Sequence, residues 1–331
     1  MKRWRKCANA GFFGQRRDRF TEYQPQRTLE EKFDLVAQVH QIQGIELKYP
    51  TDFKNPGVAR DLLAKHQLTL AAVNVDIKDA NHFRNGALSA RDARARERAV
   101  GLIKESMDLA AELGIDLVTT CPLADGYDYP FQVDYRAAWA NFIASVDTAA
   151  AYRTDVRLCL EYQPHEPHAR IMLDTVGKAL FVCSEVARPN LGINLDVGHS
   201  LAAHETPAEA ATLLAGKGRL FYIHTNDNTG DGGDWDMMSG AVHFWHWLEL
   251  LYTLDRLGYD GWFGADVSPK HMGPADAYKT NSLLLDRMGD WLEAIGADRI
   301  GELLRTGADP AAVYECLTGF MVSKPSRGGE E

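Results

Sequence analysis

The feature that most constrains the fold of this chain is a regular alternation of short β-rich runs with longer segments of helical periodicity. Apolar residues recur every three or four positions between the runs, for example over residues 90–113 and 135–152. Eight such units predict either a closed barrel or a large doubly wound parallel sheet. The runs are CANAGFF from Cys7, GIELKYP from Gly44, LTLAAVNVDI from Leu68, LVTTCP from Leu117, VRLCLEYQP from Val156, LGINLDVGH from Leu191, LFYIHTNDN from Leu220 and WFGADVSP from Trp262.

Two observations favour the closed barrel. No G-x-G-x-x-G pattern follows the first run, which removes the usual dinucleotide-binding form of an open sheet. Polar and charged residues also gather at the C-terminal ends of the runs, most of all the last four, and barrel active sites are built at those ends. We therefore predict an α/β fold, a (β/α)8 TIM barrel.

The barrel is expected to occupy residues 1–295 and to close with a helix from Pro274 to Ile295. Residues 296–331 then form a short helical extension, with helical patterns over 299–304 and 310–317, and a polar tail that we expect to be disordered at its tip. An extension outside a complete barrel often packs on a neighbouring subunit, so we predict a homo-oligomer, either a dimer or a tetramer. The aromatic run HFWHWLELLY from His243 has helical spacing, which indicates core or subunit packing.

Charge and composition restrict the partners and the compartment. The formal net charge of −10 disfavours nucleic acid and anionic membranes, because both would repel the chain. Only residues 10–13 form an apolar stretch after the basic N-terminus, which is too short for a secretion signal, and no window approaches the roughly 20 apolar residues of a membrane helix. The five scattered cysteines are interpreted as buried free thiols in a reducing cytosol. We therefore expect a soluble, cytoplasmic protein.

Four potential metal ligands stand at the ends of the last four predicted strands: Glu161, Asp196, His224 and Asp266. Singly, a strand-end acid is more often a loop cap and a histidine more often a packing residue. In a parallel barrel, however, these strand ends surround one mouth, so the four side chains can converge. Three carboxylates in a partly dry cavity repel one another unless a cation balances them. Oxygen ligands with one imidazole and no thiolate indicate Mn²⁺ or Mg²⁺, with Co²⁺ as a further candidate.

A second cluster lies in the loops that leave strands six and seven. His199 follows Asp196 by three residues, and the segment GDGGDWD offers Asp234 and Asp236. With Asp196 as a bridging ligand, these side chains would hold a second ion, giving one or two metals per subunit. The alternative interpretation is a solvated acidic turn, because Gly–Asp runs are common in loops.

These motifs resemble those of xylose isomerases. The stretch LEYQPHEP opens with E-x-x-P-x-E-P, a Gly-His pair follows the strand-six acid, and LFYIHTND, DWD and LGYDGWFGADVSP continue the likeness, which extends from about residue 8 to residue 292. His224 stands where xylose isomerases usually have an aspartate and Asp196 where they have a glutamate, and histidine at this strand end is known in rhamnose-isomerase-like and ketose-epimerase-like barrels. The resemblance implies a structural metal bound by Glu161, Asp196, His224 and Asp266, and a catalytic metal bound by Asp196, His199, Asp234 and Asp236.

The predicted pocket departs from that of xylose isomerases. Lys48 stands near the place of their ring-opening histidine, Gln163 replaces a lysine that bonds the substrate oxygen, and the segment TCPLADG lacks their tryptophan wall. Gln163 can donate a hydrogen bond, but without the charge that stabilises a developing alkoxide. Lys48 can act as a base near neutrality only if burial or a cation lowers its pKa. The metal scaffold is therefore kept, while we expect a substrate other than xylose.

The leading hypothesis is a divalent-metal-dependent sugar isomerase or epimerase of the aldose–ketose type, with a small sugar as its substrate. The metal would polarise a carbonyl and the neighbouring hydroxyl. Hydrogen would move either as a hydride, which needs both ions, or as a proton through a cis-enediol. The catalytic candidates are Glu161, Asp266, His199, Lys48, Gln163 and His165.

Two other functions remain open. The first is a metal-dependent lyase or deglycosidase subunit that cleaves keto-glycosides by proton abstraction and β-elimination. In that case His165 and His168 would supply acid and base groups, and a hetero-subunit would be a partner. The second is a non-enzymatic sugar sensor, against which the retention of all potential ligands argues.

Overall fold

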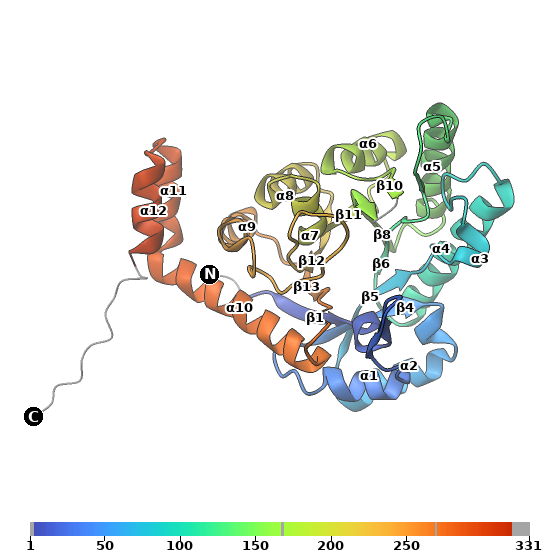
Figure 1. The fold of residues 1–331 in the computed structure, drawn as a ribbon, viewed down its shortest axis with the longest axis horizontal. Coiled ribbons are helices and arrows are strands. Elements are labelled where there is room, and N and C mark those ends of the chain that lie inside the picture. The colour runs from blue at the N-terminus through green and yellow to red at the C-terminus, as the bar shows by residue number, and fades with distance from the viewer. Residues whose placement is uncertain (1–2, 167–168, 269, 320–331) are drawn as a thin grey trace, which may run out of the picture.

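The fold is a closed barrel of eight parallel strands surrounded by helices (Figure 1). The computed structural model describes residues 3–166, 169–268 and 270–319. The strands follow one another around the barrel in the order of the sequence, and β1 pairs with both β13 and β4 to close it. The barrel strands are β1 (Arg5–Asn9), β4 (Gly44–Tyr49), β5 (Thr69–Val75), β6 (Leu117–Thr120), β8 (Arg157–Glu161), β11 (Leu191–Asp196), β12 (Leu220–Thr225) and β13 (Trp262–Ala265). The eight predicted strands and the TIM barrel are confirmed.

Helices cover the outside of the barrel, and local capping sets where they begin. The predicted helix over residues 90–113 begins later, at Ala93, because the Asp92 side chain accepts a hydrogen bond from the backbone of Arg94. The principal helices are α1 (Leu29–Val36), α2 (Pro56–His66), α4 (Ala93–Glu112), α5 (Tyr135–Ala150), α6 (Val176–Val186), α8 (Pro207–Gly216), α9 (Phe244–Leu257) and α10 (Pro274–Ile295). Short helices are η1 (Ala10–Phe13), η2 (Thr51–Phe53), α3 (Ala80–Phe83) and α7 (Val197–Ala202).

The first predicted run is shorter as a strand than its residues suggested. β1 ends at Asn9, whose side chain accepts a hydrogen bond from the backbone of Gly11 and so begins the 3-10 turn η1. The remaining apolar residues of the run belong to that turn, where Ala10 and Phe13 are buried.

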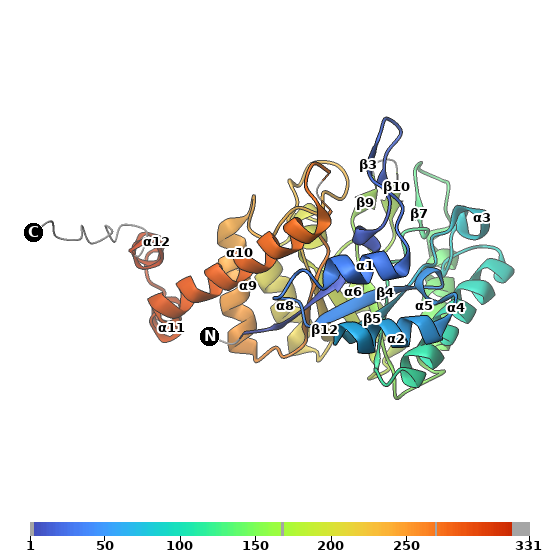
Figure 2. The same ribbon diagram turned by 90° about the horizontal axis from the view of Figure 1, so that it is seen from below.

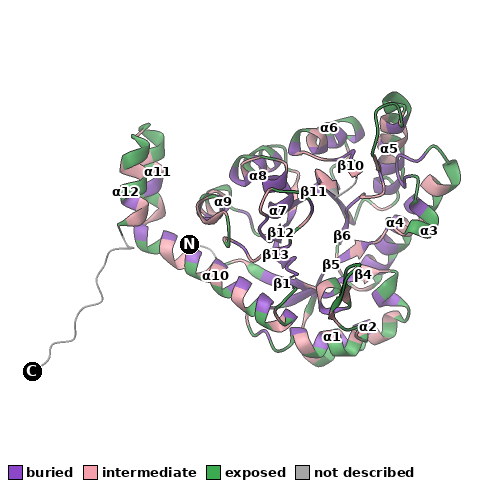
Figure 3. Cartoon of the chain, viewed as in Figure 1, coloured by how far each residue is buried: buried purple, intermediate pink, exposed green. Residues whose placement is uncertain are grey.

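Burial follows the strands and the helix faces that turn toward them (Figure 3). All six residues of β11 are buried, as expected for a strand covered on one side by helices and packed on the other inside the barrel. The interior is close-packed: a Cβ added at Gly264 of β13 would lie 2.4 Å from the hydroxyl oxygen of Tyr222. Only glycine leaves room for that ring inside the barrel, where its hydroxyl also contacts Cys7 Sγ at 3.0 Å.

Irregular insertions build a wall on one end of the barrel (Figure 2). They are a hairpin of β2 (Arg16–Arg17) and β3 (Glu22–Gln24), and a small sheet of β7 (Gly126–Tyr127), β10 (Ala169–Ile171) and β9 (His165–Glu166). Each follows the C-terminal end of a barrel strand. The carboxylate of Asp125, which precedes β7, anchors this wall by accepting hydrogen bonds from the backbone of residues 87–89 and from the Ser89 hydroxyl.

Beyond α10 the chain forms α11 (Ala297–Arg305) and α12 (Pro310–Thr318), which lie away from the barrel strands in Figure 1. The aromatic run from His243 forms α9, where Trp247 is fully buried, so its interpretation as core packing is confirmed. The division of domains at residue 295 stays a prediction. The polar segment at 323–331, whose tip was expected to be disordered, lies outside the described residues. Within the described residues, no helix combines the length and apolar character needed to cross a membrane.

Candidate metal centre

The ends of four adjacent strands bring four potential ligands together. Glu161 and Asp196 are the last residues of β8 and β11, His224 lies near the end of β12, and Asp266 directly follows β13. One ligand atom from each lies within 4.8 Å of the other three, and all four side chains are buried. The structure therefore brings together the four residues that the sequence places at the last four strand ends.

The His224 ring lies at the centre of this group. Its Nε2 contacts Oε2 of the buried Glu46 on β4 at 3.1 Å. Because a carboxylate only accepts hydrogen bonds, this contact places the proton on Nε2 and leaves Nδ1 facing the group. Nδ1 lies 3.1 Å from Asp266 Oδ2, 3.3 Å from Glu161 Oε2 and 3.7 Å from Asp196 Oδ2.

Each of the three carboxylates is oriented by an amide donor. The Nδ2 atoms of Asn194 and Asn226 donate at 2.8 Å to Glu161 Oε2 and Asp196 Oδ2 respectively. Asn9 Nδ2 donates to Asp266 Oδ1 at 3.4 Å. Asp196 also accepts from the backbone of His199 at 2.8 Å, which caps α7. Such outer partners fix the direction of ligand oxygens.

Burial and mutual repulsion disturb the ionisation of the group. Burial, reinforced by Glu161, raises the pKa of Asp196 to about 7, and burial also raises the pKa of Asp266. Burial opposes a charged His224 ring, but Glu161, Glu46 and Asp266 outweigh it and raise the pKa of His224 well above its usual range. For Glu161, burial is outweighed by the neighbouring His224 ring, which lowers its pKa to about 2. The group therefore requires a positive charge at its centre.

The donor set fits a divalent cation. Nδ1 of His224 is buried and makes no hydrogen bond, although three carboxylates surround it. A cation among these atoms would displace the Nδ1 proton that the raised pKa of His224 retains, bind the freed imidazole lone pair and balance the carboxylates together. Three oxygen ligands and one nitrogen, with no thiolate, favour Mn²⁺, Mg²⁺ or Co²⁺.

The residues of the predicted second site are differently arranged. His199 bridges two acids, with Nδ1 at 3.3 Å from Glu161 Oε1 and Nε2 at 3.2 Å from Asp234 Oδ2. Asp236 adopts a left-handed backbone with φ of 46°, and its Oδ2 lies 3.9 Å from Nη2 of Arg16. Burial, together with Asp234, raises the pKa of Asp236 well above its usual range. Within residues 3–166, 169–268 and 270–319, convergence of three or more ligating side chains occurs only in the first group.

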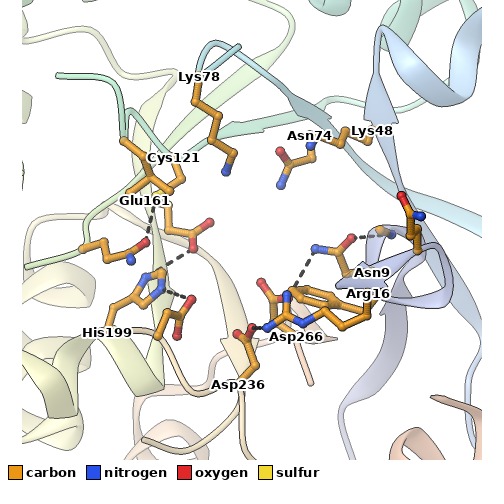
Figure 4. Close-up of a pocket in the computed structure, with 16 residues that line it drawn as sticks. Asn9, Arg16, Lys48, Asn74, Lys78, Cys121, Glu161, His199, Asp236 and Asp266 are labelled. Carbon is orange, nitrogen blue, oxygen red and sulfur yellow. Dashed lines mark hydrogen bonds and ion pairs between the residues drawn. The ribbon is translucent and has the colours of Figure 1, made fainter. Parts of the chain in front are cut away.

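A cavity of about 480 Å³ opens above the first group (Figure 4). Glu161 and Asp266 reach its surface, whereas Asp196 and His224 are not among its lining residues. In Figure 4, Glu161 and His199 lie on one side of the cavity and Lys78, Asn74 and Lys48 on the others, while Arg16 lies beside Asp236. The remaining lining residues are Asn9, Gly11, Phe12, Gln15, Arg16, Lys48, Asn74, Lys78, Cys121, Leu123, Gln163, Asp234 and Asp236.

A comparison of the sequence with known families covers most of the barrel. Residues 33–288 match the family described as xylose isomerase-like TIM barrel. The chain belongs to the xylose isomerase-like TIM barrel family.

Solved structures with the same architecture include sugar epimerases. A D-tagatose 3-epimerase-like protein shares 19% identity with this family member, with a TM-score of 0.67 over 86% of this chain and 98% of the other. A 3-keto-D-glucoside 4-epimerase from E. coli shares 16% identity, with a TM-score of 0.62 over 86% and 99%. D-psicose 3-epimerase from Clostridium cellulolyticum H10 also shares 16%, with a TM-score of 0.62 over 87% and 98%. At these identities the likeness establishes a common fold.

In this xylose isomerase-like barrel, the other catalytic candidates are placed as follows. Lys48 lines the cavity, but its Nζ forms an ion pair with Asp76 Oδ2 at 2.8 Å. The Gln163 amide accepts from Cys121 Sγ at 3.8 Å and donates to the backbone oxygen of His165 at 3.4 Å. The His165 Nε2 atom accepts from the backbone of Gly233 at 3.3 Å, and His165 is not a lining residue. His168 lies outside the described residues.

Several site residues were missed by the sequence predictions. Glu46 contacts the Nε2 atom of His224 and accepts from Asn74 Nδ2 at 2.7 Å. Its signal was an acid inside the otherwise β-rich run GIELKYP. Asn194 and Asn226 stand two residues from a predicted ligand, which is a weak signal on its own. Lys78 lines the cavity from the loop after β5, where the sequence offers no motif.

Proposed function

We propose that this protein is a divalent-metal-dependent sugar isomerase or epimerase that acts on a carbon next to a carbonyl group. One observation carries the proposal: of four converging ligands, two carboxylates, Glu161 and Asp266, also line a cavity large enough for a sugar. Sugar epimerases among the structures of the same fold support it. A single ion bound by Glu161, Asp196, His224 and Asp266 is the arrangement proposed.

When bound, the ion would polarise a carbonyl and hydroxyl of the sugar and so acidify the intervening C–H. Glu161 and Asp266 are then the carboxylates that can take a proton from that carbon and return one. They come from strands on either side of β11 and β12, so a sugar between them would meet a carboxylate from two directions. This arrangement supports proton transfer through an enediol and the inversion or shift of a carbonyl.

His199 has a positioning role in this proposal. Its ring lies between Glu161 and Asp234, both of which line the cavity. The pair with Asp234 orients the ring, because Nε2 is held at 3.2 Å from Oδ2 and Nδ1 is thereby directed to Glu161. His199 also lines the cavity, where it can contact a sugar hydroxyl.

The test follows the transferred hydrogen. The Mn²⁺-loaded protein is incubated in D₂O with a panel of ketoses, aldoses and keto-glycosides, and the sugars are followed by ¹H NMR. We expect a new isomer or epimer that carries solvent deuterium at the inverted or former carbonyl-adjacent carbon. A new sugar that carries no solvent deuterium would indicate transfer by a hydride shift in place of the enediol route. No conversion, together with release of an aglycone from a keto-glycoside, would overturn the proposal in favour of a lyase.

The compartment and the oligomer belong to the same proposal. All five cysteines are free and buried, which supports a reducing cytoplasm. Leu304 of α11 and Tyr314 of α12 are about half exposed, at 56% and 49%, and support self-association through these helices. Light scattering on the wild type and on Leu304→Glu tests this self-association. We expect the wild type to be a dimer or tetramer and the introduced glutamate to weaken it. A monomeric wild type would refute the proposal.

A further inference from the structure

The cavity contains three cationic side chains, and their partners differ. Lys48 is held by Asp76, and Arg16 lies 3.9 Å from the Asp236 carboxylate. The Nζ atom of Lys78 has no hydrogen-bond or ion-pair partner in the part of the chain that the structure describes. A charged ammonium in such a place is stabilised by whatever anionic atom comes within reach.

The backbone fixes where the Lys78 side chain enters the cavity. Lys78 follows β5, and its backbone nitrogen donates to Asp76 Oδ1 at 3.1 Å. The next residue, Asp79, caps α3 through its side chain. The turn is therefore fixed on both sides, and Figure 4 shows the Lys78 side chain extending into the cavity toward the side that carries Glu161.

The electrostatic surroundings keep Lys78 charged. Burial in the cavity opposes the charge, but neighbouring groups, Cys121 first and then Asp76, Glu161 and Asp266, outweigh it and raise the pKa of Lys78. Lys78 thus brings a positive charge to the side of the cavity that carries Glu161, the carboxylate proposed to remove the substrate proton.

We infer that Lys78 is a catalytic residue that donates a hydrogen bond to the substrate oxygen on which negative charge develops. The inference rests on the proposed function. When Glu161 takes the proton, the C–H bond breaks and its electron pair forms a C=C bond, so the carbonyl oxygen gains the negative charge. Lys78 stabilises that oxygen without transferring its own proton. Gln163 is less suited, because its amide is engaged with Cys121 and with its own loop.

The test uses threonohydroxamate, an anionic mimic of an enediolate, and threitol as a neutral polyol of the same length. Binding to the full-length, Mn²⁺-loaded protein is measured by calorimetry for the wild type, Lys78→Met and the matched control Lys270→Met. Lys270 pairs with Asp18 and is not a lining residue. Mn²⁺ binding is titrated first for every variant, so that loss of the site or of the fold is detected separately.

We expect Lys78→Met to bind Mn²⁺ normally but threonohydroxamate about 10- to 100-fold more weakly, as for the loss of a hydrogen bond to a charged group. Threitol affinity should change little, and Lys270→Met should behave as the wild type. The inference is overturned if Lys78→Met binds threonohydroxamate as tightly as the wild type. It is also overturned if Lys270→Met loses as much affinity as Lys78→Met. If the wild type binds Mn²⁺ but not the hydroxamate, the inference fails while the metal site stands. If no variant binds Mn²⁺, the proposed function itself fails.

Discussion

The Glu161→Gln variant tests whether Glu161 is a metal ligand or a residue that only stabilises the fold. Glu161 Oε2 accepts from Asn194, and the glutamine carbonyl can keep that bond. Its amide nitrogen would then take the place of Oε1 and face Nδ1 of His199, 3.3 Å away, while the carbonyl oxygen stays beside Nδ1 of His224. The substitution also removes one of the three buried carboxylate charges of the group. Because the His224 and His199 rings lower the pKa of Glu161 to about 2, the neutral glutamine also loses that stabilisation, and we expect the free energy of unfolding of the metal-free variant to fall by about 1–3 kcal/mol.

The stabilisation that bound Mn²⁺ adds to the native state should respond differently to the substitution. An ion present at about 100 times its Kd stabilises the native state by about 2.7 kcal/mol. With about 2.1 cal/mol/K of unfolding entropy per residue, the 331-residue chain has roughly 0.7 kcal/mol/K, so the increment is about 4 °C in Tm. Losing an outer partner of a ligand costs about 10- to 100-fold in affinity, and losing the ligand itself should cost at least about 100-fold. At the same metal concentration, a stabilisation of about 0.4 kcal/mol or less then remains.

The assay is scanning calorimetry on EDTA-treated protein with and without Mn²⁺. Glu205→Gln is the matched control, because Glu205 accepts from the backbone of Val176 and from the hydroxyls of Tyr162 and Ser200 but is outside the ligand group. This control should lower Tm without metal and keep the increment of about 4 °C. An undiminished increment in Glu161→Gln, or its loss in Glu205→Gln, would refute the reasoning.

Three further predictions concern the scaffold. Asp125→Ala should destabilise by about 3–5 kcal/mol in urea unfolding, because buried donors of residues 87–89 lose their acceptor; a change below 1 kcal/mol would contradict this. Native protein should not react with a thiol reagent at pH 8, since burial raises the pKa of Cys7 to about 12 and all five thiols are buried, whereas five thiols should react in denaturant. Burial opposes ionisation of Asp76, but the Lys48 ammonium outweighs it and lowers the pKa of Asp76. The ion pair therefore stabilises the fold above the ordinary aspartate pKa, and this stabilisation is lost as the pH falls through the lowered pKa of the folded state. Lys48→Met should raise the Asp76 pKa in an NMR titration, and an unchanged pKa would contradict the prediction.

The strand-helix alternation reduced the architectures to a closed barrel or a doubly wound sheet, and the polar strand ends without a G-x-G-x-x-G pattern favoured the barrel. It also predicted that Glu161, Asp196, His224 and Asp266 lie together, since parallel strands carry their last residues to one mouth. Helix α10 was predicted with its observed bounds, Pro274–Ile295, where a proline begins the helix and Gly296 ends it. These inferences needed only local pattern and the handedness and closure of the fold.

Only the tertiary structure decided which residues surround that group. Glu46 is far from His224 in the sequence, and their contact depends on β4 and β12 facing each other across the barrel interior. The second metal site at the D-x-D segment stays a prediction; in the structure Asp236 has a left-handed backbone and lies near Arg16, while Asp234 pairs with His199. Lys78 reaches the cavity because a turn after β5 directs it there. Such contacts depend on packing between distant segments, which local sequence pattern does not record.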